Sequence, residues 1–157
     1  MQVTQAVVVR EHAWVRDRAD QTVDILNSTR KRLGDLFGTA VGSVTVPEYR
    51  EAVDAVFADG DLAVNVAALV ALLRDLDVAA DYPGFVVDEL LGRELAGMLA
   101  GRQPLRLLGE ATFHYADLHV HDGDAGADDL DAALAAGFQT RLPGWEWTAT
   151  ESPFGVD

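Results

Sequence analysis

Cysteine is absent from the 157 residues of this chain. The absence excludes disulfide bonds, zinc sites built on thiolates and a cysteine nucleophile. A chain of this length buries roughly 68–70% of the surface that its unfolded form exposes, so its core needs no covalent staples. We therefore expect one domain over residues 1–157, and the lack of cysteine fits a reducing compartment, which predicts a cytoplasmic location.

Basic residues are scarce, with 12 lysines and arginines against 26 aspartates and glutamates, and the formal net charge is −14. Binding to a phosphate backbone needs a basic patch, so we expect no nucleic-acid partner. The charge is uneven, because residues 1–38 carry a net charge of +1 and residues 39–157 a net charge of −15. This field predicts a protein partner with a basic or mixed-charge surface, and the alternative is an acidic surface that is merely solvated.

Apolar runs long enough to span a membrane are also lacking. The most prominent apolar run is Leu62–Leu73, in which only Asn65 is polar. A membrane-spanning helix needs about 20 apolar residues, so we expect no membrane segment. The N-terminus has no leading positive region, so we expect no signal peptide. A helix that is apolar on every side belongs at the centre of a bundle. We therefore predict a central helix over residues 61–77, with Leu69 and Leu73 almost fully buried.

The segments before and around this helix are expected to be helical as well. Apolar residues at helical spacing predict one long N-terminal helix over residues 1–38. Three consecutive β-branched residues, Val7-Val8-Val9, favour a strand at residues 3–10 as the alternative. Residues 45–101 are expected to form the helical core, beginning at a capping box in Thr45-Val-Pro-Glu48.

The C-terminal part, residues 105–157, is expected to form a β, loop and tail region. Residues 111–121 are rich in β formers and loosely alternating, which predicts a small strand. A short helix is expected to begin with Asp128 as its cap and to end at Gly137. The sequence thus predicts a mainly α-helical fold with minor β content, namely a helical bundle with a small β element and an aromatic tail.

A cluster of potential metal ligands falls within the predicted strand, because His114, Asp117, His119 and His121 lie within eight residues. On a strand, the last three side chains project from one face, and imidazole and carboxylate ligands suit a divalent transition metal. The string Asp117-Leu-His-Val-His121 also resembles the opening metal motif of the polymerase and histidinol phosphatase family of phosphoesterases. In that family further ligands follow over a long stretch, whereas residues 122–157 contain no histidine. A complete domain of that family is therefore excluded, and the alternative to a metal site is a set of surface histidines.

Two other kinds of site have weaker support. Residues 57–68 resemble a degenerate EF-hand loop with Asp59 and Asp61 at ligand positions, but Phe57 and Ala68 stand where the first and last ligands belong. We therefore expect an ordinary capped helix junction and no bound calcium. None of the three serines lies in a Gly-x-Ser-x-Gly turn, so we predict no catalytic residues of that type.

The absence of a complete catalytic motif favours a non-catalytic, acidic protein-binding module, of the inhibitor, immunity-protein or assembly-component type. The alternatives are a small metal-dependent enzyme that uses residues 114–121, and a structural subunit of a larger particle. Aromatic residues in the tail would anchor a partner and aspartates near residue 130 would steer it. The predicted partner-binding residues are Trp145, Trp147, Phe154, Asp128, Asp129 and Asp131.

Overall fold

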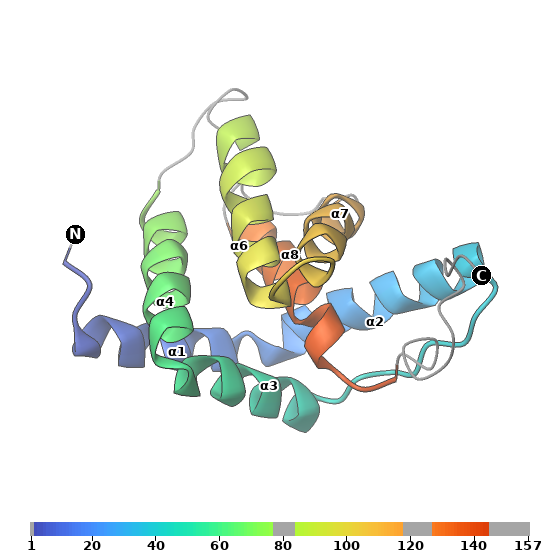
Figure 1. Cartoon of the computed structure of the whole chain (residues 1–157), viewed down its shortest axis with the longest axis horizontal. Helices are drawn as coiled ribbons and strands as arrows, with labels where there is room; N and C mark the ends of the chain where they lie inside the picture. The colour runs from blue at the N-terminus through green and yellow to red at the C-terminus, as the bar shows by residue number, and fades with distance from the viewer. Residues whose placement is uncertain (1, 77–83, 118–126, 145–157) are drawn as a thin grey trace.

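The computed structural model describes residues 2–76, 84–117 and 127–144 (Figure 1). These residues contain seven α-helices, one π-helix and one short 3-10 helix, and no strand. The mainly α-helical fold is therefore confirmed. The aromatic tail lies outside the described residues.

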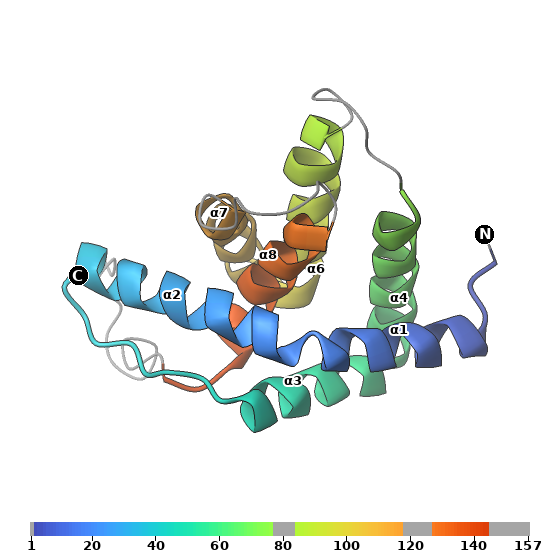
Figure 2. The ribbon, with the colours of Figure 1, turned by 180° about the vertical axis from the view of Figure 1, so that it is seen from behind.

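The N-terminal segment forms two helices, α1 (Gln5–Asp17) and α2 (Ala19–Phe37), which lie nearly end to end along the base of the molecule (Figures 1 and 2). The prediction of one continuous helix is wrong at Arg18, where the helical backbone breaks with φ −81° and ψ 9°. The alternative strand at residues 3–10 is also wrong, because Val7-Val8-Val9 lie in α1. The side chain of Thr4 accepts a hydrogen bond from the Val7 N–H and caps this helix.

The next two helices are α3 (Val46–Ala58) and α4 (Gly60–Asp75), joined by Asp59 alone and bent by 110° relative to each other. The predicted capping box at the start of α3 is confirmed, since Thr45 and Glu48 exchange side-chain and backbone hydrogen bonds. The short junction agrees with the expected helix junction rather than a calcium-binding loop, although the Asp59 side chain makes no capping hydrogen bond. Helix α3 packs beside α1 and α2. Helix α4 also contacts α1 and α3, but its axis rises from this base layer (Figure 1).

The remaining elements are the π-helix η1 (Val86–Gly92), α6 (Arg93–Ala100), α7 (Leu105–Asp117), α8 (Ala127–Phe138) and the 3-10 helix η2 (Gln139–Arg141). Helices α6, α7 and α8 pack against one another, and α8 also contacts α2 and α3 (Figures 1 and 2). Together these elements form the second half of the bundle.

Glycines allow the helices of this half to approach closely. A Cβ atom added at Gly92 would lie 2.7 Å from the Phe113 ring, and one added at Gly137 would lie 2.5 Å from the Cβ of Leu99. Gly137 is therefore a packing position in the last turn of α8, which ends at Phe138, one residue beyond the predicted end. The close contact with α6 requires a residue without a side chain at this position.

The small β element predicted near residues 111–121 is wrong over 111–117, which belong to α7. The buried residues of α7 are Gly109, Thr112, Phe113 and Ala116. Their spacing of three and four is that of one helix face, so packing against α6 and α8 overrides the β propensity of this segment.

The centre of the bundle is α8 and not α4. Every residue from 130 to 139 is buried. In α4, by contrast, Leu73 is 3% exposed as expected, but Leu69 is only half-buried, and Val64 and Leu72 are 46% and 40% exposed. A helix does form over most of residues 61–77, but the prediction that it is central is wrong, because the face of α4 that carries Val64 and Leu72 is exposed to solvent.

A buried arginine holds the segment that follows α8 in place. The Arg30 guanidinium of α2 donates hydrogen bonds to the Gln139 side chain (2.5 Å) and to the carbonyl groups of Gly42 (2.7 Å) and Pro143 (2.5 Å). Burial of this side chain lowers the pKa of Arg30 to about 10, although the nearby Glu48 opposes the shift. The role of this residue is structural, because its donors are directed at the Gln139 side chain and at backbone carbonyl groups of its own chain.

Candidate functional site

Two of the predicted metal ligands, His114 and Asp117, lie on a helix and not on the predicted strand. His114 is exposed on α7, with its Nδ1 3.1 Å from the Oε2 of Glu89, and Asp117 is the last residue of the same helix. His119 and His121 lie outside the described residues. Across the described ranges, no three His, Cys, Asp or Glu side chains come together to hold a metal ion. The metal site stays a prediction, and the strand on which it was based is wrong as far as residue 117.

Of the predicted partner-binding aspartates, Asp131 is not available to a partner. It is 4% exposed, and its carboxylate accepts hydrogen bonds from the Nε (3.0 Å) and Nη2 (2.5 Å) of Arg18. The pair ties α8 to the break between α1 and α2. Asp128 and Asp129 lie in the first turn of α8, and their side chains are not among those described. Trp145, Trp147 and Phe154 lie outside the described residues.

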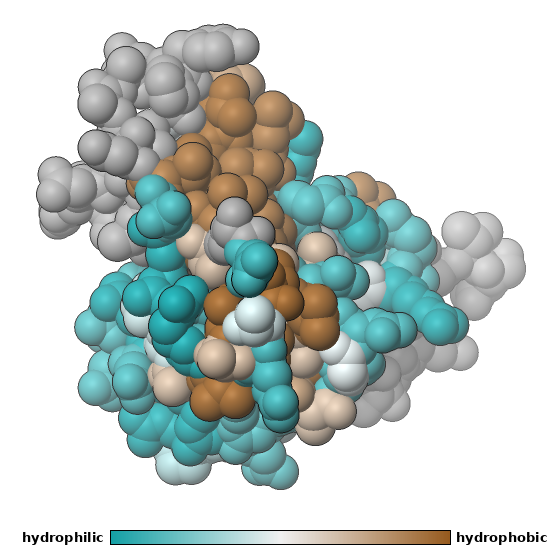
Figure 3. Space-filling view, turned by 90° about the vertical axis from the view of Figure 1, so that its left-hand side faces the viewer, coloured by the Kyte–Doolittle hydropathy of each residue, from teal (hydrophilic) through white to brown (hydrophobic). Residues whose placement is uncertain are grey.

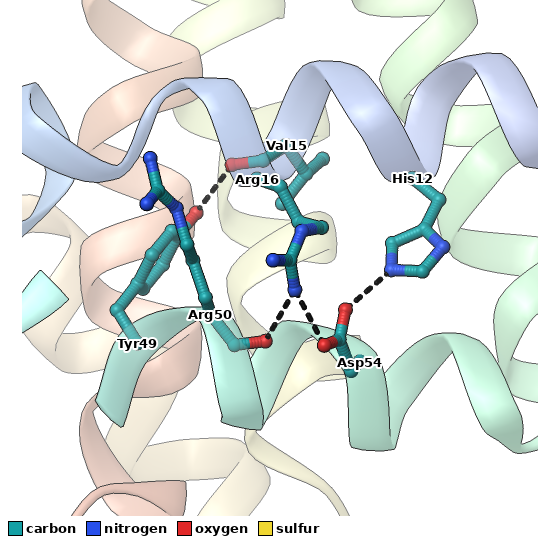
Figure 4. Close-up of polar contacts among 6 residues, drawn as sticks. All are labelled: His12, Val15, Arg16, Tyr49, Arg50 and Asp54. Carbon is teal, nitrogen blue, oxygen red and sulfur yellow. Dashed lines mark hydrogen bonds and ion pairs between the residues drawn. The ribbon is translucent and has the colours of Figure 1, made fainter. Parts of the chain in front are cut away.

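A polar cluster that the sequence analysis missed joins α1 to α3 (Figure 4). The Nε2 of His12 lies 2.7 Å from the Oδ1 of Asp54, and Arg16 donates to the other oxygen of the same carboxylate and to the Arg50 carbonyl (3.4 Å). The His12 ring also stacks on Phe57, with 4.7 Å between the ring centroids.

The charges of this cluster are matched within it. Partial burial alone would raise the pKa of Asp54, but the hydrogen bonds from Arg16 and His12 outweigh it and hold the pKa below its ordinary value. Among the described residues, no hydroxyl group is hydrogen-bonded to His12 or Asp54, so the pair lacks the nucleophile of a catalytic triad. The cluster therefore serves as a contact between helices.

A second missed cluster lies between α1 and α4, where a pocket of about 590 Å³ opens. Glu11 is fully buried there, and its two carboxylate oxygens accept from the Nε of Arg10 (2.9 Å) and the Nη1 of Arg74 (2.5 Å). The Arg74 guanidinium also lies 4.5 Å from the centroid of the Trp14 ring. The pocket is lined by Arg10, Glu11, Ala71, Arg74 and Asp75.

This pocket is a poor candidate for acid–base chemistry. Both oxygens of Glu11 are engaged by arginines. The pair instead holds α4 against α1. The sequence contains a signal for this ion pair. Glu11 stands four residues before Val15 in the apolar stripe of α1, and a charged residue within such a stripe indicates a buried ion pair.

The surface of α4 and η1 carries a group of exposed hydrophobic residues, which we call the apolar band. Figure 3 shows hydrophobic residues gathered over this side of the molecule, from α4 toward the upper end of η1. On α4 and in the residue after it, Val64 is 46%, Leu72 40% and Leu76 38% exposed; beside and within η1, Phe85 is 57% and Leu90 48% exposed. The two elements contact each other, so their exposed residues belong to neighbouring surfaces.

Acidic residues stand at both ends of the α4 part of the apolar band. Asp61 and Asp75 are exposed and form no ion pair with any described residue. On the η1 side, Glu89 pairs with His114 and Glu94 pairs with Arg106. The unpaired charges along α4 are therefore negative, and the uncharged residues exposed between them are Val64, Asn65 and Leu72.

Comparison with known proteins identifies one family. A family model described as a domain of unknown function (DUF7984) matches residues 1–157. The chain belongs to this family. No curated protein and no solved structure matches the chain. The family assignment therefore covers the whole chain and carries no activity with it.

No single helix in the described part of the chain is long and apolar enough to cross a membrane. Among the described residues, α3 and α4 reach the required length and composition when taken together, but they are bent by 110°.

Proposed function

We propose that this member of the DUF7984 family is a non-catalytic, acidic protein-binding module whose partner presents a basic or mixed-charge surface. The observation that carries the proposal is the apolar band on α4 and η1. Exposed hydrophobic residues grouped on neighbouring elements are typical of a protein–protein interface, whereas single exposed ones are ordinary.

The polar clusters of the described residues support a binding role rather than a catalytic one. The carboxylates of Glu11, Asp54 and Asp131 each accept hydrogen bonds from an arginine of the same chain, so their charges are paired within the protein. Catalytic acids and bases need an open side directed at a substrate. The apolar band, in contrast, is a feature that the chain does not satisfy by itself.

Because the net charge of this chain is −14, we expect the partner to carry positive charge on its binding surface. Such a field raises the rate of encounter with a positively charged surface and lowers it for a negative one. The apolar band would then supply the affinity, since interface energy concentrates in a few buried side chains while charges at the rim set the association rate.

The test is affinity capture with cross-linking in cells that express the protein natively, using wild type and the Leu72→Asp/Leu90→Asp variant. A matched control is Leu36→Asp/Leu107→Asp, which places the same charges at exposed leucines outside the apolar band. We expect one basic protein to be captured by wild type and control and reduced at least tenfold with the band variant. Equal capture by all three folded proteins would overturn the proposal, and melting curves check the folding of each.

The aromatic tail stays a predicted second anchor. If Trp147 contacts the partner, Trp147→Ala should raise the dissociation rate and weaken binding by about 2 kcal/mol. If this side chain packs on its own chain, the substitution should lower the melting temperature and leave the affinity of the folded fraction unchanged. Binding kinetics and thermal melting of the same variant separate these outcomes.

A further inference from the structure

We propose that the apolar band binds an amphipathic helix of the partner, with basic residues flanking the apolar face of that helix. This inference rests on the proposed function and names the partner's form and chemistry. It follows from the elements that carry the apolar band, their spacing and the charges at their ends.

The apolar band lies on two helical elements that stand beside each other above the base layer (Figure 1). Along α4, Val64 and Leu72 are separated by eight residues, which places them two turns apart on one face, with the half-buried Ala68 between them. Side chains in such rows form ridges into which another helix packs its own ridges. A partner helix with apolar residues at positions i, i+3 or i+4 and i+7 matches this spacing.

An extended peptide is a worse match for this surface. Strand addition requires an open sheet edge whose backbone groups are free, and the described residues contain no strand. The backbone of α4 and η1 is hydrogen-bonded within its own helices. Recognition at the apolar band therefore depends on side-chain packing, and a helix offers the densest row of side chains.

The charges on α4 give the partner helix its basic flanks. Asp61 and Asp75 are exposed at opposite ends of α4, 14 residues apart in the sequence. At a rise of 1.5 Å per residue, their backbone positions are about 21 Å apart. A partner helix of similar length that carries lysine or arginine near both ends would place a positive charge beside each aspartate.

A second copy of this chain is a poorer occupant than a basic helix. Each copy carries a net charge of −14, so two copies repel each other as they approach. Val64, Leu72 and Leu76 would also meet the same acidic flanks on the other copy if α4 paired with α4. A partner of opposite charge turns both of these effects from unfavourable to favourable.

The experiment uses the full chain and three 18-residue fluorescent peptides in anisotropy titrations. The first peptide is an amphipathic helix with leucines at i, i+3, i+4 and i+7 spacing and lysines at both ends. The second has the same composition in scrambled order, and the third has glutamate in place of lysine. We expect the first peptide to bind wild type at least tenfold more tightly than the other two, and circular dichroism to show a gain of helix on binding.

Protein variants then locate the site. Leu72→Asp/Leu90→Asp should weaken binding of the first peptide at least tenfold, whereas the control Leu36→Asp/Leu107→Asp should leave it unchanged. Asp61→Asn/Asp75→Asn should slow association, and the difference should shrink in high salt. Equal weakening by the band and control variants would show charge attraction without a site and would overturn the inference.

Failure of the inference can be distinguished from failure of the proposed function. If capture of a partner from cells depends on the apolar band but the first peptide binds no better than its scrambled form, the binding function stands and the helical partner is wrong. Sedimentation of the free protein gives the remaining outcome. A dimer that the band variant abolishes would assign the apolar band to a second copy and overturn the inference.

Discussion

Helices α4 and α8 are both largely apolar, yet they occupy opposite environments. Helix α4 contains the bulkier side chains, but Val64 and Leu72 are exposed to solvent. Helix α8 carries small residues on several sides, and every position from 130 to 139 is buried. The difference teaches that coverage of every face by neighbouring helices, rather than the hydrophobicity of a helix, decides which one is central.

The reason lies in how closely other helices approach. Because α8 carries alanines and Gly137, neighbouring helices can approach its backbone closely, and α2, α3, α6 and α7 all contact it. Helix α4 contacts α1, α3, α6 and η1, but no helix of the described residues covers the face that carries Val64 and Leu72. Tight packing around small residues therefore compensates for the smaller apolar area of each side chain.

Truncation of one leucine in each helix should give the largest difference. Leu134 of α8 is fully buried, so Leu134→Ala should lower the free energy of unfolding by about 2–5 kcal/mol. Leu72→Ala on α4 removes a side chain that is 40% exposed and should cost less than about 1 kcal/mol. Urea unfolding measures both, and equal losses would contradict the assignment of α8 as the centre.

The ion pairs that tie α4 and α8 to the N-terminal helices should show a common asymmetry. In each pair the acid is the buried member, with side chains of Glu11 1% and Asp131 5% exposed, against 32% for Arg74 and 27% for Arg18. Removing the arginine leaves a buried carboxylate, so Arg74→Met should cost about 2 kcal/mol, less than for a fully buried pair because Arg10 remains.

The reciprocal substitution sharpens this test. Glu11→Met removes the buried charge and leaves arginines that solvent can reach, so it should cost less than about 1 kcal/mol. The double variant should be more stable than Arg74→Met alone. A double-mutant cycle from urea unfolding measures the coupling, and additive effects would contradict the described contact.

Two glycines give a matched comparison of the packing around each helix. Gly137→Ala places a methyl group 2.5 Å from the Cβ of Leu99 and should destabilise the protein by about 1–3 kcal/mol. Gly60→Ala, in the first turn of α4, meets no atom within 4 Å and should stabilise it by up to about 1 kcal/mol. Opposite shifts in melting temperature are expected, and a rise for both would show that α6 and α8 pack loosely.

Loss of the exposed contact between α1 and α3 should have the smallest effect on stability. It gives a reference value against which the substitutions in α4 and α8 can be compared. The pKa of Asp54 lies below its ordinary value of 3.8, so its pairing stabilises the fold above that pH and is lost as the pH falls through the folded pKa. Asp54→Asn should cost less than about 1 kcal/mol at neutral pH, because the side chain is 50% exposed. Melting temperatures of the two proteins should converge below pH 3.8, and a difference independent of pH would contradict the ionic origin.

Some features of the fold could be predicted because their causes are local. The capping box at Thr45 and Glu48 depends on two residues three positions apart, and the helical spacing of apolar residues in α1 to α4 is readable within one segment. The small β element failed because the pattern at residues 111–117 contains both β formers and a helix-face spacing. Contacts with α6 and α8 decided between them.

The candidate site shows the same division. The sequence offered His114 and Asp131 as functional residues, but it could not show that Asp131 meets Arg18, since 113 positions separate them. The pairs Glu11–Arg74 and His12–Asp54 were missed for the same reason. The apolar band could not be foreseen either, because an apolar helix looks identical in sequence whether it is covered on all sides or on one.

By itself, the sequence determined the helical class, the absence of disulfide bonds, the acidic charge and the start of α3. Each of these depends on composition or on residues within one turn of each other. Only the tertiary structure decided that α8 is central, that Gly137 is a packing position and that α4 exposes Leu72. The physical reason is that burial is a property of the space around a residue, and that space is filled by segments distant in the chain.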